Sequence, residues 1–426
     1  KSKNIEIIEE GKTRKYIASK GPLEEVKGIL SRYKFVPIKE LPRFCGGLVG
    51  YMSYDMIRFF EKIPDKNEDD LGLYDSIFML TDTILIFDHV DHKIKVVSNA
   101  HIKNNSSKKE INKAYKEALR KIDSIVGRLK APLPKSRSAR PQGRQAEIKT
   151  KSNFTNRAFA KIVEKAKEYI QKGDIIQAVL SQRVEISLKK SEPFNIYRAL
   201  RSINPSPYMY YLKFGDMKMI GSSPEILVRC EEGKVETRPI AGTRPRGKNE
   251  DEDQMLMVEL LSDPKEKAEH IMLVDLGRND IGRVCDFKTI VVPELMAVEK
   301  YSHVMHIVSD VYGKLSKDKD VFDVLRAAFP AGTVTGAPKI RAMEIIDELE
   351  NIRRGPYSGC VGYFSFSGNL DTCITIRTII VNKKKAYIQA GAGIVADSDP
   401  QKEYQETLNK ARAMMNAVES SEKGFD

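Results

Sequence analysis

The chain places extended apolar segments one after another with only short turns between them, and this pattern constrains the fold most. In the C-terminal half, SGCVGYFSF, CITIRTIIVN and KAYIQAGAGIV follow one another through turns at 367–369 and 382–383. Such turns join antiparallel neighbours, whereas parallel strands need a crossover of a dozen or more residues. Separate long helices are expected after Pro264, Pro338 and Pro400. The pattern predicts an α+β fold, with helices packed on antiparallel sheets in a layered sandwich.

A strongly basic stretch separates two parts of the chain. Residues 101 to 151 carry 15 Lys or Arg against 4 Asp or Glu, which accounts for +11 of the formal net charge of +12. Helical periodicity between Ile111 and Ile125 gives way to LKAPLPKSRSARPQGRQ, which is typical of an exposed linker. We therefore predict an N-terminal α+β region over 1–130, a basic linker over 131–150 and a motif-rich domain over 151–426.

Two interpretations of this basic stretch are open. Its Lys and Arg side chains could neutralise the phosphates of a nucleic acid, which would make the chain a non-catalytic binding protein. The stretch could instead be a solvated connector beside a basic surface helix. No aromatic side chain lies within the linker to stack on a base, and no recognised nucleic-acid motif accompanies it. The sequence favours the connector, and we expect neither nucleic acid nor membrane as a partner.

Cysteine usage and hydropathy indicate the compartment. The five cysteines are odd in number, far apart and without a C-x-x-C pair, which is typical of free thiols in a reducing cytoplasm. No run approaches the ~18 uncharged apolar residues of a membrane span. The first residues show no apolar run of the kind found in a secretory signal. We expect a cytoplasmic protein.

Carboxylates occupy positions where a helix should present apolar side chains. In PKEKAEHIMLVDLGRND, Glu269 shares a face with Met272, Leu273 and Leu276, and Glu266 lies one turn earlier. A carboxylate on an apolar stripe is costly unless it is paired or bound to a cation. This helix is therefore expected to direct acidic side chains toward a positive partner.

A second helix repeats this arrangement. In DPQKEYQETLNKARAMM, Glu403, Glu406 and Lys410 fall at i, i+3 and i+7 on one face. Considered alone, they could form a salt-bridge ladder on the surface. Acids that converge from two helices would instead form a pocket for a hard divalent cation such as Mg²⁺, which prefers oxygen ligands and usually keeps water or substrate oxygens among them.

Three further features indicate anion binding. AGAGIV, at 390–395, has two glycines that let a ligand approach the backbone closely. PAGTVTGAPK, at 330–339, precedes a helix whose N-terminus, opened by Gly336 and Ala337, could bind an anion. Both segments could also be plain turns. Arg377 is a charge inside the apolar strand CITIRTII, and either a ligand carboxylate or a structural ion pair could neutralise it.

Taken in order, the motifs of the chain resemble those of one enzyme family. SSPEILVRC, RPIAGTRPRG, AEHIMLVDLGRNDIGRV, KYSHVMHIVSDVYG, FPAGTVTGAPK, RGPYSGCVGYFSF, CITIRT, AGAGIVADSDP and EYQETLNKARA closely resemble the chorismate-utilising enzymes, above all the anthranilate synthase component I family. The similarity is dense from about residue 160 to 415, and GGLVGYMSYD and NPSPYMYYL extend it weakly. It implies the chorismate-binding-enzyme fold, a catalytic domain over 151–426 and an N-terminal region that is incomplete relative to the family.

The resemblance implies how the substrate chorismate and a Mg²⁺ cofactor would be held. Glu269 and Glu406 would be the metal ligands, with Glu266 and Glu403 beside them, and the metal would hold the ring carboxylate of chorismate. The other implied substrate-binding residues are Gly242, Thr243 and Thr333 on the ring side, Tyr357, Arg377, Gly391, Ala392 and Gly393 around the enolpyruvyl carboxylate, and Lys410.

The resemblance also implies the roles of the catalytic residues. Glu225, in SSPE, would protonate the departing C4 hydroxyl while ammonia attacks C2. His306 would act near the ring in the later elimination of pyruvate, or it could be a buried histidine bonded to the backbone. Thr243 and Gln177 complete the implied catalytic set.

Two positions distinguish among members of the family. Aminodeoxychorismate synthases typically carry a Lys nucleophile in place of Ala241, and isochorismate and salicylate synthases typically carry a water-activating Lys where Gln177 stands. Both departures favour an anthranilate synthase, the lyase that begins tryptophan biosynthesis. Aminodeoxychorismate synthase component I, of the folate pathway, is the alternative.

The resemblance implies two further partners. Ammonia would come from a glutamine amidotransferase subunit, component II, in a heterodimer or heterotetramer, since the chain shows no amidotransferase segment. L-Tryptophan would be a feedback inhibitor that contacts Pro207, Tyr208 and Met209 in NPSPYM. The other half of that inhibitor site is an N-terminal Leu-Leu-Glu-Ser-type segment, which we do not find, so inhibition of this chain stays an open question.

Overall fold

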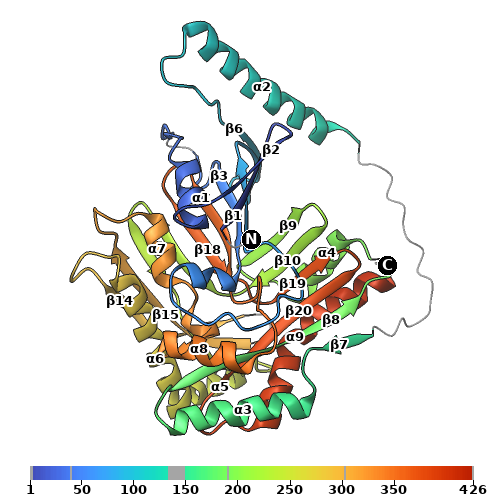
Figure 1. Cartoon of the computed structure of the whole chain (residues 1–426), viewed down its shortest axis with the longest axis vertical. Helices are drawn as coiled ribbons and strands as arrows, with labels where there is room; N and C mark the ends of the chain where they lie inside the picture. Colours follow the sequence, from blue (N-terminus) through green and yellow to red (C-terminus); the bar gives the residue numbers. More distant parts are fainter. Residues whose placement is uncertain (1–2, 39–40, 133–148, 190, 302–303, 425–426) are drawn as a thin grey trace.

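The computed structural model describes residues 3–38, 41–132, 149–189, 191–301 and 304–424, and its body consists of two antiparallel sheets flanked by helices (Figure 1). One sheet has seven strands. Tight turns connect its neighbours, as at Lys383, which adopts a φ of 56° between β19 and β20. In spatial order the strands are β16 (Gly336–Ala337), β8 (Gln177–Ser187), β20 (Lys385–Ile394), β19 (Thr378–Asn382), β10 (Met217–Ser223) and β9 (Tyr208–Phe214), while β7 (Thr150–Ser152) pairs with β8.

The second sheet has nine strands and combines both ends of the chain. Gly368, with a φ of 85°, lies in the turn that joins β17 to β18, and β17 pairs on its other side with β3 from the N-terminal region. In spatial order the strands are β13 (Ile240–Pro245), β15 (Val304–Lys314), β12 (Lys234–Thr237), β11 (Ile226–Glu231), β18 (Leu370–Ile374), β17 (Cys360–Ser365), β3 (Gly47–Met52) and β4 (Ser76–Thr81), while β14 (Val291–Lys300) pairs with β15.

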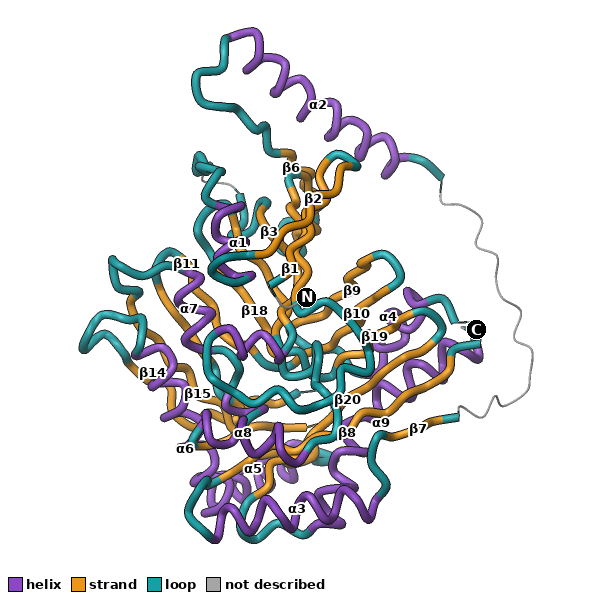
Figure 2. The backbone as a smooth tube through the Cα atoms, in the orientation of Figure 1, coloured by secondary structure: helices purple, strands orange, loops and turns teal. Residues whose placement is uncertain are grey.

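The two sheets face each other across an apolar core. Tyr51, Met219, Val361, Cys373 and Ile380 are buried in one cluster, although they come from strands of both sheets. Separate clusters cover the outer faces, where helices pack. The molecule is therefore layered as helices, sheet, sheet and helices, as the backbone trace shows (Figure 2). The prediction of an α+β sandwich of antiparallel sheets is confirmed.

Helices begin where side chains cap their first N–H groups. Asp263 accepts hydrogen bonds from the N–H groups of Lys265 and Glu266, and Asp399 caps another helix in the same way, each followed by a proline at the first position. The helices are α3 (Asn156–Gln171), α4 (Pro193–Ile203), α8 (Lys339–Leu349) and α9 (Pro400–Lys423) against the seven-stranded sheet, and α5 (Glu250–Ser262), α6 (Pro264–Gly282) and α7 (Val321–Ala328) against the nine-stranded sheet.

The N-terminal region contributes to the body and to an arm. β3 and β4 belong to the nine-stranded sheet, and α1 (Pro22–Leu30) and the 3₁₀ helix η1 (Tyr54–Phe59) pack on the same core. Thus the regions on either side of the predicted linker share one sheet, while 133–148 of that linker lie outside the described residues. Two small hairpins complete the region, β1 (Asn4–Glu9) with β2 (Lys12–Ile17), and β5 (Thr83–Asp88) with β6 (Lys93–Ser98).

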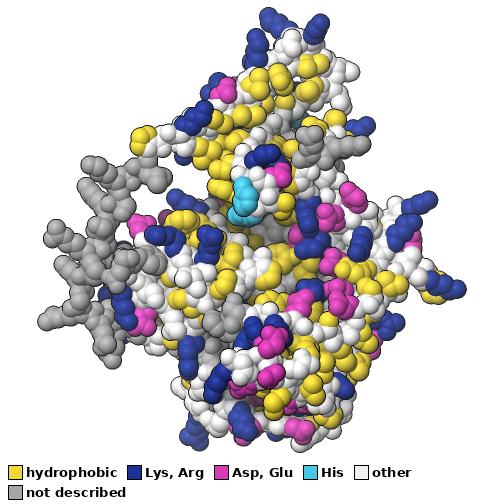
Figure 3. Space-filling view, turned by 180° about the vertical axis from the view of Figure 1, so that it is seen from behind, with side chains coloured by type: hydrophobic (Ala, Val, Ile, Leu, Met, Phe, Trp, Pro, Cys, Tyr) yellow, Lys and Arg dark blue, Asp and Glu magenta, His cyan; other side chains and the backbone are white. Residues whose placement is uncertain are grey.

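The arm is the helix α2 (Lys108–Lys130), which projects from the body and contacts β6 (Figure 1). A capping box between Ser107 and Glu110 starts it, and Lys121 forms an ion pair with Asp82 at 2.7 Å. Hydrophobic side chains lie among the basic ones on this part of the surface (Figure 3). None of the helices in the described residues is both long and apolar enough to cross a membrane.

Candidate active site

One cavity of about 750 Å³ is lined by almost all of the catalytic, substrate-binding and metal-binding residues that were predicted from the sequence. It is bordered by β8 and β20 of one sheet, β13 and β15 of the other, and helices α6 and α9. The predicted residues that line it are Gln177, Glu225, Gly242, Thr243, Glu266, Glu269, His306, Thr333, Tyr357, Arg377, Gly391, Gly393, Glu403, Glu406 and Lys410. Ala392, Pro207, Tyr208 and Met209 are not among its lining residues.

Helix α6 supplies two of the four carboxylates. Glu269 accepts a hydrogen bond from Gln177 Nε2 at 3.2 Å, and Glu266 Oε1 lies 3.2 Å from Arg244 Nη1. Burial raises the pKa of Glu269, and the negative charge of Glu266 raises it further. A positive charge placed beside this pair would relieve both effects.

Helix α9 supplies the other two carboxylates. Glu406 forms an ion pair with Lys410 at 2.7 Å, and both side chains are partly exposed to the cavity. Of the salt-bridge ladder considered from the sequence, the pair between Glu406 and Lys410 is therefore present. Burial raises the pKa of Glu403, and the neighbouring charge of Glu406 adds to that effect. Each helix thus presents a carboxylate whose ionised form is destabilised by a neighbouring negative charge.

The four carboxylates fit a hard divalent cation bound with the help of other ligands. Among the described residues, no three His, Cys, Asp or Glu side chains lie close enough to enclose a metal by themselves. Mg²⁺ is commonly held by one or two carboxylates, with water and substrate oxygens completing its shell. Oxygen donors on two facing helices, each beside a like charge, suit that mode of binding.

Arg377 contributes a positively charged guanidinium to the lining of the cavity. Within the described chain its guanidinium pairs with no carboxylate, and it donates one hydrogen bond, to the Lys410 carbonyl, at 3.4 Å. A guanidinium has five donors, so most of those of the partly buried Arg377 remain available to an anion. Of the two interpretations left open by the sequence, the structural ion pair is absent from the described residues.

The predicted position of Arg377 inside a strand is wrong. β18 ends at Ile374 and β19 begins at Thr378, and these two strands belong to different sheets. Arg377 lies where the chain crosses between the sheets, with a φ of 49° in the left-handed region. Such backbone is uncommon for a non-glycine residue and is often found at functional sites.

The glycines of β20 are needed because other side chains approach them closely. A Cβ on Gly391 would lie 2.8 Å from the Tyr357 hydroxyl oxygen, and a Cβ on Gly393 would lie 2.5 Å from Gln177 Nε2. Lys410 Nζ also donates to the Gly391 carbonyl at 3.0 Å. Ala392 lies between them on the other face of the strand, because side chains alternate, and it is fully buried against α3 and α8.

Glu225 is a carboxyl group whose burial prepares it to hold a proton. It follows β10 at the start of β11, it is 8% exposed, and burial raises its pKa to about 7. The neighbouring Thr333 side chain and the positive charges of Lys410 and Arg377 oppose that increase. Near neutral pH a substantial fraction of Glu225 is therefore protonated and able to act as an acid.

His306 has a defined tautomer in its neutral form. Its Nδ1 lies 3.0 Å from the Gly242 carbonyl oxygen and 3.0 Å from Thr243 Oγ1. A carbonyl only accepts, so Nδ1 carries the proton and Nε2 has a lone pair. Burial lowers the pKa of His306, which favours this neutral form. The backbone contact considered as the alternative to a catalytic role is therefore present, and it orients the imidazole.

The other predicted segments have different surroundings. Tyr208, at the start of β9, donates to Asp371 Oδ1 at 2.8 Å and accepts from Arg229 Nη2 at 3.1 Å. Gly336 and Ala337 form the short strand β16 against β8, so they do not open a helix as expected. Helix α8 starts afterwards, at Lys339, and Thr333 lies in the 3₁₀ helix η2 (Gly332–Val334).

Four polar residues that line the cavity were not predicted to do so, namely Asn204, Lys265, Gln389 and Asn409. Lys265 lies beside the acidic pair of α6, and its charge acts on Glu269 and Glu403. Asn409 is three residues after Glu406, so helical periodicity could have found it. Gln389 lies two residues before Gly391 on β20, so strand alternation could have found it.

Comparisons with known proteins show what the chain is similar to. A family model described as chorismate binding enzyme matches residues 3–416. Anthranilate synthase component 1 of Acetivibrio thermocellus is 52% identical over 422 residues, 98% of this chain and 84% of that protein. The Aquifex aeolicus (strain VF5) protein of the same name is 53% identical over 420 residues, covering 98% and 83%. The crystal structure of anthranilate synthase component I from Streptococcus pneumoniae TIGR4 superposes with a TM-score of 0.83 at 40% identity, covering 97% and 90%.

Proposed function

The chain belongs to the chorismate binding enzyme family, and from that premise we propose that it is the catalytic subunit of an anthranilate synthase. In this reaction chorismate and ammonia give anthranilate, pyruvate and water. The observation that carries the proposal is the meeting of a protonatable carboxyl group, an oriented imidazole, two carboxylate pairs and a partly buried guanidinium in one cavity.

Chorismate carries two carboxylates, and the cavity offers a different partner for each. Arg377, with the Tyr357 hydroxyl and the open backbone at Gly391, would bind the enolpyruvyl carboxylate. Glu269 and Glu406 would hold Mg²⁺, with Glu266 and Glu403 beside them. Bound Mg²⁺ would neutralise the ring carboxylate. Gly242, Thr243 and Thr333 would line the ring between these two ends.

Glu225 would act in the first half of the reaction. Hydroxide is a poor leaving group, so the C4 hydroxyl must receive a proton as its bond to carbon breaks. The Glu225 carboxyl would give that proton, and water would leave as ammonia forms its bond to C2. The product of this half is an aminated ring that still carries the enolpyruvyl group. Because Ala241 offers no nucleophile, no covalent bond to the protein is needed.

His306 would act in the second half. Its Nε2 lone pair can accept the proton from C2 while the bond between C3 and the enolpyruvyl oxygen breaks. The electrons of the C–H bond then complete the aromatic ring, and the released enol becomes pyruvate on protonation. Thr243 and Gly242 keep the imidazole in the tautomer that this step requires.

The proposal includes partners and location. We place the chain with a glutamine amidotransferase subunit that supplies ammonia, as the name component 1 of its relatives suggests. Tryptophan would bind at Pro207, Tyr208 and Met209, outside the reaction cavity, as a feedback inhibitor. All five cysteines are buried and unpaired, which accords with the reducing cytoplasm.

Product identity tests the proposal. The purified chain is incubated with chorismate, an ammonium salt and Mg²⁺, and the products are separated and detected by anthranilate fluorescence. We expect anthranilate and pyruvate in equal amounts. Aminodeoxychorismate or isochorismate as the product would overturn the assignment within the family. No turnover together with salt-dependent binding of DNA would overturn the catalytic assignment altogether.

A further inference from the structure

A buried ion pair lies directly behind the cavity. Arg354 and Glu350 have side chains that are 1% and 2% exposed, and they form two parallel hydrogen bonds of 2.9 and 2.7 Å. A buried ion pair usually contributes little to stability, because desolvation of both charges offsets their attraction. The Arg354–Glu350 pair is therefore better explained by a role other than stability.

The remaining donors of Arg354 reach three segments that line the cavity. Nη2 donates to the Val179 carbonyl on β8 at 2.6 Å, and Nη1 donates to the Val334 carbonyl in η2 at 2.7 Å. The guanidinium also lies 5.5 Å from the Tyr357 ring centroid, and Nη1 is 3.2 Å from Ser358 Oγ. Val179, Val334 and Tyr357 all line the cavity.

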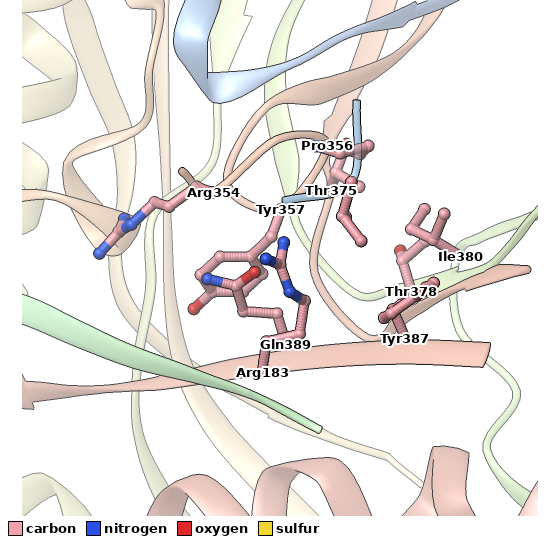
Figure 4. Close-up of a pocket in the computed structure, with 10 residues that line it drawn as sticks. Arg183, Arg354, Pro356, Tyr357, Thr375, Thr378, Ile380, Tyr387 and Gln389 are labelled. Atoms are coloured by element: carbon pink, nitrogen blue, oxygen red, sulfur yellow. The ribbon is translucent and has the colours of Figure 1, made fainter. Parts of the chain in front are cut away.

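Glu350 extends this connection to a fourth point. Its Oε1 accepts from both the N–H and the hydroxyl of Ser181, at 2.8 and 2.7 Å, and Ser181 Oγ in turn accepts from Gln389 Nε2 at 2.9 Å. Figure 4 shows a smaller pocket that Arg354 lines and that shares Tyr357 and Gln389 with the cavity. One guanidinium thus joins β8, η2, β20 and the loop that carries Tyr357.

We propose that Arg354 is a positioning residue for the substrate site, which fixes the Tyr357 hydroxyl and the backbone of η2 and β8 at the distances that chorismate requires. The inference rests on the proposed function. Lysine could not replace it, because an ammonium group cannot make two parallel bonds to Glu350 and also reach two carbonyls in fixed directions. Arg354 itself does not line the cavity, so its action on the substrate passes through Val179, Val334 and Tyr357, which do.

The experiment compares Arg354→Lys and Glu350→Gln with Arg229→Lys. Arg229 is a partly buried arginine with carboxylate partners, Asp371 and Glu236, that lie outside the cavity. We expect both cavity-side variants to remain folded and to lose about 100-fold in kcat/KM for chorismate, mainly through KM. The control should stay within about threefold of the wild type. Equal losses in all three variants, or wild-type KM in Arg354→Lys, would overturn the proposal.

Hydrogen exchange supplies a readout that needs no substrate. In Arg354→Lys we expect faster exchange in the segments 177–183, 332–337 and 355–360, while Arg229→Lys leaves them unchanged. Uniformly faster exchange, or failure of both cavity-side variants to fold, would make Arg354 a purely structural residue. If the wild type does not convert chorismate, the proposed function fails, whereas the exchange pattern still decides whether Arg354 orders these segments.

Discussion

At the scale of single residues, burial sets what the titratable groups of the cavity can do. Glu225 and His306 are both partly withdrawn from water. Burial raises the pKa of the Glu225 carboxyl and lowers the pKa of the His306 imidazole, and both shifts favour the neutral form of the group. A protonated carboxyl group and a neutral imidazole can therefore coexist in one cavity near pH 7, as the two proton transfers that we propose would require.

Glu225→Gln separates catalysis from stability. We expect kcat to fall by about 10²–10⁴-fold, because the amide cannot donate the proton. The wild-type rate should fall as pH rises above about 7, and this limb should be missing from the residual activity of the variant. Activity profiles of the wild type and the variant from pH 5 to 9 check both expectations. If the two profiles have the same shape, Glu225 is not the general acid.

Glu225→Gln should lower activity, but it should not lower the free energy of unfolding. Folding raises the pKa of Glu225 from its ordinary 4.5 to about 7, so the folded state holds this proton more tightly than the unfolded state and loses stability as pH rises from about 4.5 to about 7. Replacing the group should remove a penalty on the order of 3 kcal/mol at high pH. Denaturant unfolding at pH 8 should therefore find Glu225→Gln at least as stable as the wild type. A less stable variant would contradict the burial argument.

His306→Asn tests the order of steps. The asparagine amide can still donate to the Gly242 carbonyl, but it has no lone pair basic enough to accept the C2 proton. Amination should continue while elimination stops, so the aminated intermediate should accumulate without anthranilate fluorescence, as chromatography would show. The exposed His101→Asn serves as the control. Normal anthranilate formation in His306→Asn would exclude the histidine as the base.

At the scale of elements, much of the fold follows from short-range signals, but positions at the junctions do not. Turns and helix starts were readable because one or two residue types decide them, as Pro264 and Pro400 do. Arg377 was placed in a strand because the apolar run continues through it, whereas the chain changes sheets there. That crossing depends on contacts between distant strands. Ala392 was included with its glycine neighbours, although strand alternation places it on the other face.

Gly393→Ala tests the close packing of β20 against β8. The added methyl would lie 2.5 Å from Gln177 Nε2, so it should displace the amide that bonds Glu269. We expect a loss of about 1–3 kcal/mol in unfolding free energy and weaker chorismate binding. Gly127→Ala, in α2, has open space around it and should be neutral or stabilising by up to about 1 kcal/mol. Equal effects of the two substitutions on chorismate KM would refute this packing argument.

At the scale of the whole molecule, the cavity exists because two sheets and two helices distant in sequence meet. Glu269 on α6 and Glu406 on α9 line the same cavity, which periodicity alone could suggest but not establish. The N-terminal strands β3 and β4 extend one of the sheets, and nothing in their local pattern indicated that partnership. Long-range pairing of this kind follows from the complete packing arrangement and not from any single segment.

We propose that this cavity holds Mg²⁺ and chorismate together, so each must strengthen the binding of the other by the same factor. Calorimetric titration of Mg²⁺, without any ammonia source, measures this in the presence and absence of chorismate. We predict that chorismate tightens Mg²⁺ binding at least tenfold, and that Glu269→Gln and Glu406→Gln, while still folded, lose this coupling. Mg²⁺ affinity that is the same with and without chorismate would contradict the account.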